Sequence, residues 1–334
     1  MARAAKIEQI QKAVKGANSL RHALAKVIAA GYAPIEVNLF RAMLAYFDNQ
    51  PYSEVTEVHQ HYVEYFNKAK NKIRCEIADL LVISFSESRC TMRASFIQAK
   101  REVVPQVRNK FRFHLAANQY QLLYNCPIID PKGTGLPANI FSDACSDAIS
   151  SYGVFYREGK DFDFAYEITS MLNPSEPLKQ TGTMICCFST LQNEFGQACR
   201  VKGLKQLHYD NAPWCYCNEA LLSSLKADVF EWSLSRGKTG SPLIGKMARQ
   251  IIRFIRRLHK DSPSEVSSRF AHFIAHYPKF WWREENGMSY IPNRRDDDNN
   301  RREEGDSNNI EWMMPRYIML VDADRAEYRN LEER

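Results

Sequence analysis

The sequence predicts an α/β protein, and three observations lead to that prediction. Apolar residues recur at helical spacing through residues 1–50, which is typical of amphipathic helices. Two strand-like runs, 76–85 and 92–100, follow with a polar turn between them. A last apolar run at 317–321 predicts a buried strand that returns to the body of the protein. Together these runs predict a chain that combines helices and strands.

Composition narrows the class of protein. The chain has 334 residues, of which 45% are hydrophobic and 25% charged, and its net charge is +6. These values are typical of a globular protein and exclude a collagen-like, coiled-coil or wholly disordered chain. The length suffices for one large domain or two small ones. The mild positive charge permits nucleic acid as a partner without requiring it.

The sequence also indicates a compartment. The apolar runs are far shorter than the roughly 20 residues that a membrane span needs. The first residues lack the apolar segment of a secretory signal. Nine cysteines are too few for a disulfide scaffold in a chain of this length. We therefore expect a cytoplasmic protein with no membrane partner.

Changes in composition divide the chain into five parts. Ser19 is a plausible N-cap and Gly31 a plausible stop in the helical part, and a helix is expected after Ser53, over about 54–70. The predicted parts are a helical N-terminal extension over 1–50, a core over 51–135, a mixed α/β region of unknown role over 136–292, a charged loop or linker over 293–309, and a C-terminal strand and tail over 310–334.

One group of polar residues in the sequence is a candidate active site. The run 76–85 is apolar on both faces, which predicts a strand buried on both sides, and Asp79 is the exception within it. A buried carboxylate is costly unless it is paired or binds a metal. On the next strand Gln98 and Lys100 are two residues apart and therefore share a face. If the two strands form a hairpin, Asp79, Gln98 and Lys100 converge at one edge of the sheet.

Such a convergence suits the hydrolysis of phosphodiesters. Asp79 and the side-chain oxygen of Gln98 are ligands for Mg²⁺ or Mn²⁺, and Lys100 is suited to orienting the attacking water and offsetting charge on the phosphate. Two protein oxygens are few, so a third acid is expected. Glu57 and Glu64 lie seven residues apart, on one face of the predicted helix. We assign Glu64 as the third metal ligand and keep Glu57 in reserve.

These residues resemble a known family. Asp79 followed by Gln98-Ala99-Lys100 resembles the D…(E/Q)xK signature of the PD-(D/E)xK, or restriction-endonuclease-like, nucleases, although Ala78 stands where the family places proline. The glutamine version followed by Lys-Arg is similar to Mrr-type restriction enzymes. The resemblance covers about 51–130, including an apolar run at 121–124 where many members place a helix beside the site. It implies a mixed sheet with a helix on each side, Mg²⁺-dependent cleavage of DNA, and a role in restriction or antiphage defence.

Basic residues suggest where DNA would bind. Contacts of this kind position a duplex through its phosphates and carry little sequence information. The candidates lie in the basic stretch 100–114 and in a predicted basic amphipathic helix over 245–260, and they are Arg101, Arg108, Lys110, Arg112, Arg253, Arg256 and Arg257.

Several alternatives stay open from the sequence. The chain would also fit a non-catalytic DNA- or protein-binding module that retains the nuclease fold, and a nuclease that acts on RNA. The constellation would also fit an ordinary hairpin with one satisfied aspartate. The sequence leaves open whether the protein is a homo-oligomer.

Overall fold

The computed structural model describes residues 2–58, 62–107, 110–131, 149–169, 172–174, 183–187, 227–237, 239–242, 251–252, 255–256, 263–276, 284–285, 288–289 and 315–326. The helices with bounds in these ranges are α1 (Ala2–Val14), α2 (Leu20–Ala29), α3 (Glu36–Asp48), α4 (Ala117–Asn125), α7 (Ala227–Ser235) and α9 (Glu265–His276). The strands are β1 (Ser53–Glu57), β2 (Tyr62–Phe66), β3 (Lys72–Glu76), β4 (Leu80–Ser86), β5 (Thr91–Val107), β6 (Lys110–Ala116), β7 (Ile129–Pro131), β8 (Ser150–Glu158), β9 (Asp161–Ile168), β10 (Asn173–Pro174), β11 (Thr183–Cys187), β12 (Ser241–Pro242), β13 (Glu284–Glu285), β14 (Met288–Ser289) and β15 (Tyr317–Asp322).

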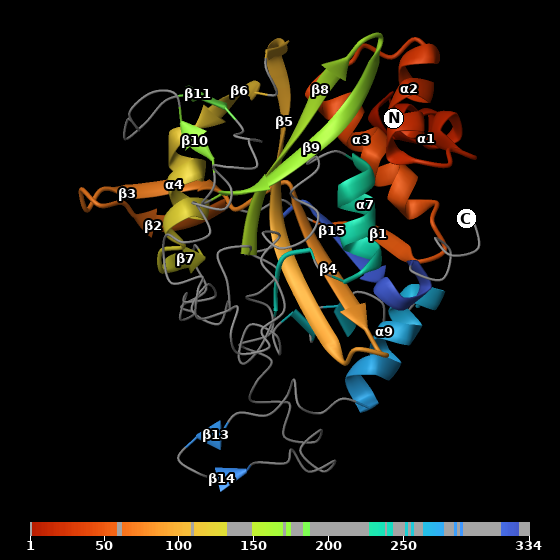
Figure 1. Cartoon of the computed structure of the whole chain (residues 1–334). Coiled ribbons are helices and arrows are strands. Elements are labelled where there is room, and N and C mark those ends of the chain that lie inside the picture. The colour runs from red at the N-terminus through yellow and green to blue at the C-terminus, as the bar shows by residue number, and fades with distance from the viewer. Residues whose placement is uncertain are drawn as a thin grey trace.

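A mixed sheet of ten strands forms the centre of the molecule (Figure 1). Strand β4 pairs antiparallel with β5 and parallel with β15, and β1 closes that side against β15. On the other side β5 pairs parallel with β8, which forms a hairpin with β9. The predicted α/β class, with a mixed central sheet flanked by helices, is therefore confirmed.

Strand β5 is long and pairs with different strands along its length. Its first part pairs with β4 and β8, and its second part pairs with β6, which continues the sheet to β11 and β10. The register against β6 shifts between Glu102 and Val104 and again between Val104 and Val107. Pro105 lies inside the second shift, where its missing N–H breaks the regular ladder.

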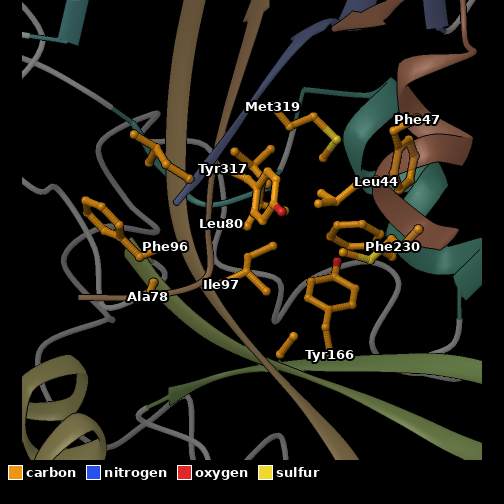
Figure 2. Packing of buried hydrophobic residues seen from close by; sticks show 14 of the residues in the cluster. Leu44, Phe47, Ala78, Leu80, Phe96, Ile97, Tyr166, Phe230, Tyr317 and Met319 are labelled. Atoms are coloured by element: carbon orange, nitrogen blue, oxygen red, sulfur yellow. The ribbon is translucent and has the colours of Figure 1, made fainter. Parts of the chain in front are cut away.

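The two faces of the sheet are covered by different helices. Figure 2 shows Phe47 of α3 and Phe230 of α7 packed over Ile97 and Tyr166 of the sheet. The ring of Phe230 lies 4.8 Å from that of Tyr166 and 5.9 Å from that of Phe47, both edge-on, as aromatic pairs prefer. Helix α4 covers the opposite face of the sheet (Figure 1), where the rings of its Tyr120 and of Tyr152 in β8 lie 6.4 Å apart.

The helical N-terminal part forms as expected. Ser19 caps α2 through its hydroxyl, which accepts a hydrogen bond from the backbone of His22 at 3.2 Å. Helix α2 ends just before Gly31, whose φ of +85° suits glycine. The buried residues of α1, α2 and α3 belong to the same hydrophobic cluster as the sheet.

The helix expected over 54–70 is wrong, because this segment forms β1 and β2. The residues of these two strands are mostly β-branched or aromatic, which favours strands. In β2 the central residues Val63, Glu64 and Tyr65 are buried, while Tyr62 and Phe66 at its two ends are exposed. The expected strand over 76–85 also begins later, at Leu80, so Asp79 lies directly before β4.

Other sequence expectations are met where the structure describes them. Strand β4 is buried along its whole length, the run 121–124 lies in α4, and 317–321 lies in the buried strand β15. Within the basic helix expected over 245–260, residues 251–252 and 255–256 are described and helical. The charged segment 293–309 lies outside the described residues. Within the part of the chain that the structure describes, no helix has both the length and the apolar character to cross a membrane.

Glu231 of α7 joins the N-terminal helices to the rest of the fold. One carboxylate oxygen accepts a hydrogen bond from the backbone N–H of Leu20 at 2.6 Å, and the other accepts from the Tyr46 hydroxyl at 3.3 Å. Burial is the main reason that the pKa of Glu231 is raised to about 7. The folded protein therefore holds a proton that the unfolded chain releases between the ordinary glutamate pKa and about 7.

This proton makes stability fall as pH rises. The contribution is fully present below the ordinary pKa of 4.5 and is lost as pH rises through about 7. We expect Glu231→Gln, which stays neutral and keeps an acceptor oxygen, to flatten the dependence of unfolding free energy on pH by up to about one proton between pH 5 and 7. Urea unfolding across this range measures the slope. Asp161→Asn, which changes an exposed acid, is the control, and an equal flattening in both variants would contradict the assignment.

Candidate active site

The backbone around Asp79 is fixed by two neighbouring strands. Residues 77–79 link β3 to β4, and Ile77 and Ala78 are buried. The N–H of Asp79 donates to the carbonyl of Ile97 in β5 at 3.2 Å, and its carbonyl accepts from the N–H of Tyr317 in β15 at 3.2 Å. Asp79 is therefore held in line with the sheet although it lies just outside β4.

The structure brings the side chains of Asp79, Gln98 and Lys100 together. Leu80 pairs with Ile97, so the residue before Leu80 lies opposite Gln98. The Gln98 Nε2 donates to Oδ2 of Asp79, and the backbone N–H of Ala99 donates to the same oxygen at 2.8 Å. The convergence that hairpin geometry predicts is present, with one difference: the amide nitrogen of Gln98, and not its oxygen, faces Asp79.

A second glutamine holds Gln98 in this orientation. Gln119, in the first turn of α4, donates from Nε2 to Oε1 of Gln98 and to the backbone carbonyl of Glu76, the latter at 3.4 Å. Both glutamines are buried. Gln119 is not among the residues predicted from the sequence. The sequence does contain a signal for this residue: Gln119 is at a buried position of an amphipathic segment, two residues before the apolar run at 121–124.

Lys100 faces an acid that was not predicted from the sequence either. Its Nζ lies 3.8 Å from Oε1 of Glu36, in the first turn of α3. The side chain of Lys100 is 17% exposed and that of Glu36 is 42% exposed, so the pair lies at the border between core and solvent. Like the third acid expected from the sequence, Glu36 lies on a helix. This helix is the third of the chain, and Glu36 lies 64 residues before Lys100.

The electrostatics of the site centre on Asp79. The pKa of Asp79 is raised to about 6, mainly by burial and also by the negative charges of Glu36 and Glu76. The charge of Lys100 and the hydrogen bond from Ala99 oppose this rise. The carboxyl group of Asp79 is thus influenced by two acids and one lysine, and this excess of negative charge favours a bound cation.

Glu76 is an odd step from Asp79 along the strand expected over 76–85, so regular alternation would make its side chain face away from Asp79. That expectation assumed an unbroken strand from residue 76 to residue 83. Strand β3 ends at Glu76, and the irregular link 77–79 ends the alternation of side chains. As a result the charge of Glu76 acts on Asp79.

Glu64 takes another place in the structure. It lies on β2, which belongs with β3 and β7 to a separate three-stranded sheet. Its carboxylate forms an ion pair with Lys72 at 2.7 Å, with only 11% of the Glu64 side chain exposed. The reserve candidate Glu57 lies on β1 and pairs with Arg316 at 2.6 Å. Because the expected helix is replaced by strands, Glu36 is better placed than Glu64 to act beside Asp79.

A row of polar residues continues across the sheet from Gln98. Tyr152 of β8 lies opposite Gln98, and Glu167 of β9 lies opposite Tyr152. Burial raises the pKa of Glu167 to about 8. Its Oε2 is buried, with no hydrogen-bond partner among the described residues. Glu167 is therefore mostly protonated at neutral pH and adds little charge to the group around Asp79.

The candidate DNA contacts are described only in part. Arg101 follows Lys100 on β5, is exposed, and places its guanidinium 5.8 Å from the ring centre of Phe162. Arg256 is exposed on a described helical turn. The side chains of the other candidates lie outside the described part of the structure, and these are Arg108, Lys110, Arg112, Arg253 and Arg257.

Comparison of the chain with protein-family models, with curated proteins and with solved structures found no match. The geometry of the site is therefore the basis for any functional conclusion.

The charges around Asp79 lead to a paired prediction. We expect Lys100→Met to raise the pKa of Asp79, because it removes a positive charge that lowers it. We expect Glu36→Gln to lower the pKa of Asp79, because it removes a negative charge that raises it. Carboxyl ¹³C shifts of selectively labelled aspartate, followed from pH 4 to 8, measure both changes.

The control for this pair is Glu57→Gln, because Glu57 lies on a different strand, β1, and pairs with Arg316. Its titration curve for Asp79 should match that of the wild-type protein. Shifts of the same sign in Lys100→Met and Glu36→Gln would show that the two side chains do not flank Asp79 as described.

Proposed function

We propose that this protein is a metal-dependent nuclease that hydrolyses the phosphodiester bonds of DNA. The observation that carries the proposal is the meeting of Asp79, Lys100 and Glu36 at the end of the β4–β5 pair. Carboxylates and a lysine at one partly exposed point form the set of groups that phosphodiester hydrolysis needs.

The arrangement of the fold supports the proposal. The chain runs from helix α3 through β4 and β5 to helix α4 and then to β8, which is parallel to β5. Helices α3 and α4 lie on opposite faces of this sheet (Figure 1). This arrangement is similar to the restriction-endonuclease-like core that the D…(E/Q)xK signature implies. We extend the proposal, on that resemblance alone, to a role in restriction or antiphage defence.

The donor set fits a hard divalent cation such as Mg²⁺ or Mn²⁺. All candidate ligands are oxygens, and Glu36, Glu76 and Asp79 carry more negative charge than Lys100 offsets. Among the described residues, no three His, Cys, Asp or Glu side chains are grouped closely enough to hold a metal by themselves. We therefore expect two carboxylates, Asp79 and Glu36, with the amide oxygen of Gln98 and water completing the ligands.

Gln98 would have to turn for this role. Its oxygen accepts from Gln119 and its nitrogen donates to Asp79, so rotating the amide by half a turn directs the oxygen toward the carboxylates. The rotation breaks both hydrogen bonds, and a bound cation compensates for that loss. Gln119 would have to turn as well and give up its bond to the Glu76 carbonyl, so that its amide oxygen accepts from the turned nitrogen of Gln98.

Each group has a role in the proposed reaction. When bound, the cation polarises the phosphate and lowers the pKa of a water molecule. Asp79 and Glu36 would hold the cation, whose positive charge offsets their repulsion of the substrate phosphate. Lys100, whose side chain is mostly buried, orients the attacking water and offsets the charge that develops on the phosphate.

One observation favours a second candidate, a non-catalytic DNA- or protein-binding module. Gln98 is neutral where glutamate would add a charged ligand, and its amide nitrogen already satisfies Asp79. A site whose hydrogen bonds are complete in this way would be stable without a cation. The two candidates differ in whether divalent cations produce cleavage.

Cleavage of supercoiled plasmid in Mg²⁺ or Mn²⁺ tests the proposal. We expect the wild-type protein to nick the plasmid and both Asp79→Ala and Lys100→Ala to lose about 100-fold or more of the rate. Glu36→Gln should lose more than Glu64→Gln, since the charge of Glu36 acts on Asp79 while Glu64 pairs with Lys72. Circular dichroism and thermal melting confirm that each variant is folded.

The control for these variants is Glu57→Gln, which removes a carboxylate from β1 and should cleave at nearly the wild-type rate. The same assay with an RNA substrate distinguishes a ribonuclease. If the wild-type protein cleaves neither polymer with either cation, yet binds duplex DNA as well as Lys100→Ala does, the binding module is the correct function.

A further inference from the structure

The β2–β3 hairpin is regularly paired and comes directly before the site in the chain. The strands pair from Tyr62 opposite Glu76 to Phe66 opposite Lys72. Its turn is closed by hydrogen bonds from the N–H groups of Asn67 and Asn71 to the carbonyl of Asn71 and the side chain of Asn67, at 3.0 and 2.9 Å. The hairpin therefore holds its side chains in a preformed arrangement.

The two faces of the hairpin differ sharply. On the inner face Val63 and Tyr65 are buried, and the Tyr65 hydroxyl donates to the carbonyl of Asn118 in α4 at 2.6 Å. On the outer face Tyr62 is 44% exposed and Phe66 is 65% exposed. Large aromatic side chains on an anchored, exposed face indicate a binding surface, because solvent exposure of such rings is unfavourable.

Positive charge is concentrated in the outer part of the hairpin, around its turn. Residues 65–75 contain four cations and neither aspartate nor glutamate, and the four are exposed: Lys68, Lys70, Lys72 and Arg74. The guanidinium of Arg74 lies 4.8 Å from the ring centre of Tyr62. The acid on this face of β2, Glu64, forms an ion pair with Lys72, and Glu76 lies at the base of the hairpin. The outer part of the hairpin is therefore complementary to a polyanion.

We infer that the outer face of the β2–β3 hairpin binds single-stranded nucleic acid. Cations interact with the phosphates, and unpaired bases stack on exposed aromatic rings. Bases inside a duplex already stack on one another and do not offer their faces to Phe66. Tyr62 and Phe66 are four residues apart on one strand, or about 13 Å, so one extended strand reaches both rings.

The hairpin also leads directly to the site. Strand β3 ends at Glu76, three residues before Asp79, and Gln119 contacts both the Glu76 carbonyl and Gln98. A strand held on the hairpin would be directed toward Asp79. This step rests on the proposed function and deepens it, because it assigns to the nuclease a substrate with an unpaired segment beside the cleaved bond.

Fluorescence anisotropy of the full chain in EDTA, where cleavage is absent, tests binding by itself. The probes are a labelled 20-nucleotide oligo-dT, an oligo-rU of the same length and a 20-base-pair duplex. We expect the single strands to bind more tightly than the duplex. Phe66→Ala and Tyr62→Ala should each weaken single-strand binding about tenfold. A higher affinity for oligo-dT or for oligo-rU identifies DNA or RNA as the favoured source of the strand.

Matched substitutions separate stacking from simple apolar contact. Phe66→Leu keeps an apolar side chain without the ring and should bind as weakly as Phe66→Ala, whereas Phe66→Trp should retain binding. Lys68→Ala and Lys70→Ala should each reduce the salt dependence of binding by about 0.7 in the logarithmic slope. Val103→Ala is the control, because Val103 is a 45% exposed apolar residue on β5.

Two results would overturn the inference. One is single-strand binding that is unchanged in Phe66→Ala and Tyr62→Ala; the other is self-association of the wild-type protein that Phe66→Ala and not Phe66→Leu abolishes, which would make the face a protein interface. Because the binding assay contains no divalent cation, its result does not depend on cleavage. A protein that binds as expected in EDTA but cleaves nothing in Mg²⁺ or Mn²⁺ supports the hairpin assignment and rejects the nuclease. Cleavage by the wild-type protein together with unaltered binding in the variants supports the nuclease and rejects the hairpin assignment.

Discussion

The site depends on a carboxylate that is placed at the edge of a buried sheet. Burial disfavours the charge of Asp79, and its neighbours compensate in part through the N–H of Ala99, the amide of Gln98 and the charge of Lys100. These groups are fixed by different pairings of the sheet, because β4–β5 register sets Gln98 and Lys100 while β15 holds the Asp79 backbone. The position of one side chain thus reflects the whole strand order.

Charge also connects the site to the N-terminal helices. Glu36 begins α3, and α3 is held to α2 and α7 through the contacts of Glu231 with Leu20 and Tyr46. The aromatic packing of Phe47 on Phe230 fixes the other end of α3. The helical extension is therefore more than a cover for the sheet, since its packing decides where an acid meets Lys100.

The small sheet and the large sheet have complementary chemistry. The site at the large sheet has acids and one lysine acting on Asp79, while the hairpin of the small sheet exposes two rings and, over residues 65–75, four cations and no acid. Helix α4 joins the two, because Tyr65 bonds to its backbone and Gln119 bonds to Gln98. A polyanion attracted to the hairpin would meet the acids of the site only where a cation offsets their charge, which is consistent with a metal-dependent reaction.

The sequence by itself determined the features that depend on local periodicity. Helical spacing predicted the first three helices, and period-two alternation predicted that Gln98 and Lys100 share a face and meet Asp79 across a short turn. The tertiary structure decided the rest. Glu36 and Gln119 reach the site because helices pack on the sheet, and they lie 64 residues from Lys100 and 21 from Gln98 in the chain. The sequence placed Glu64 on a helix, which is wrong. A short segment of β-branched and aromatic residues fits the helical and the strand period alike, and only its pairing with β3 and β7 makes it a strand.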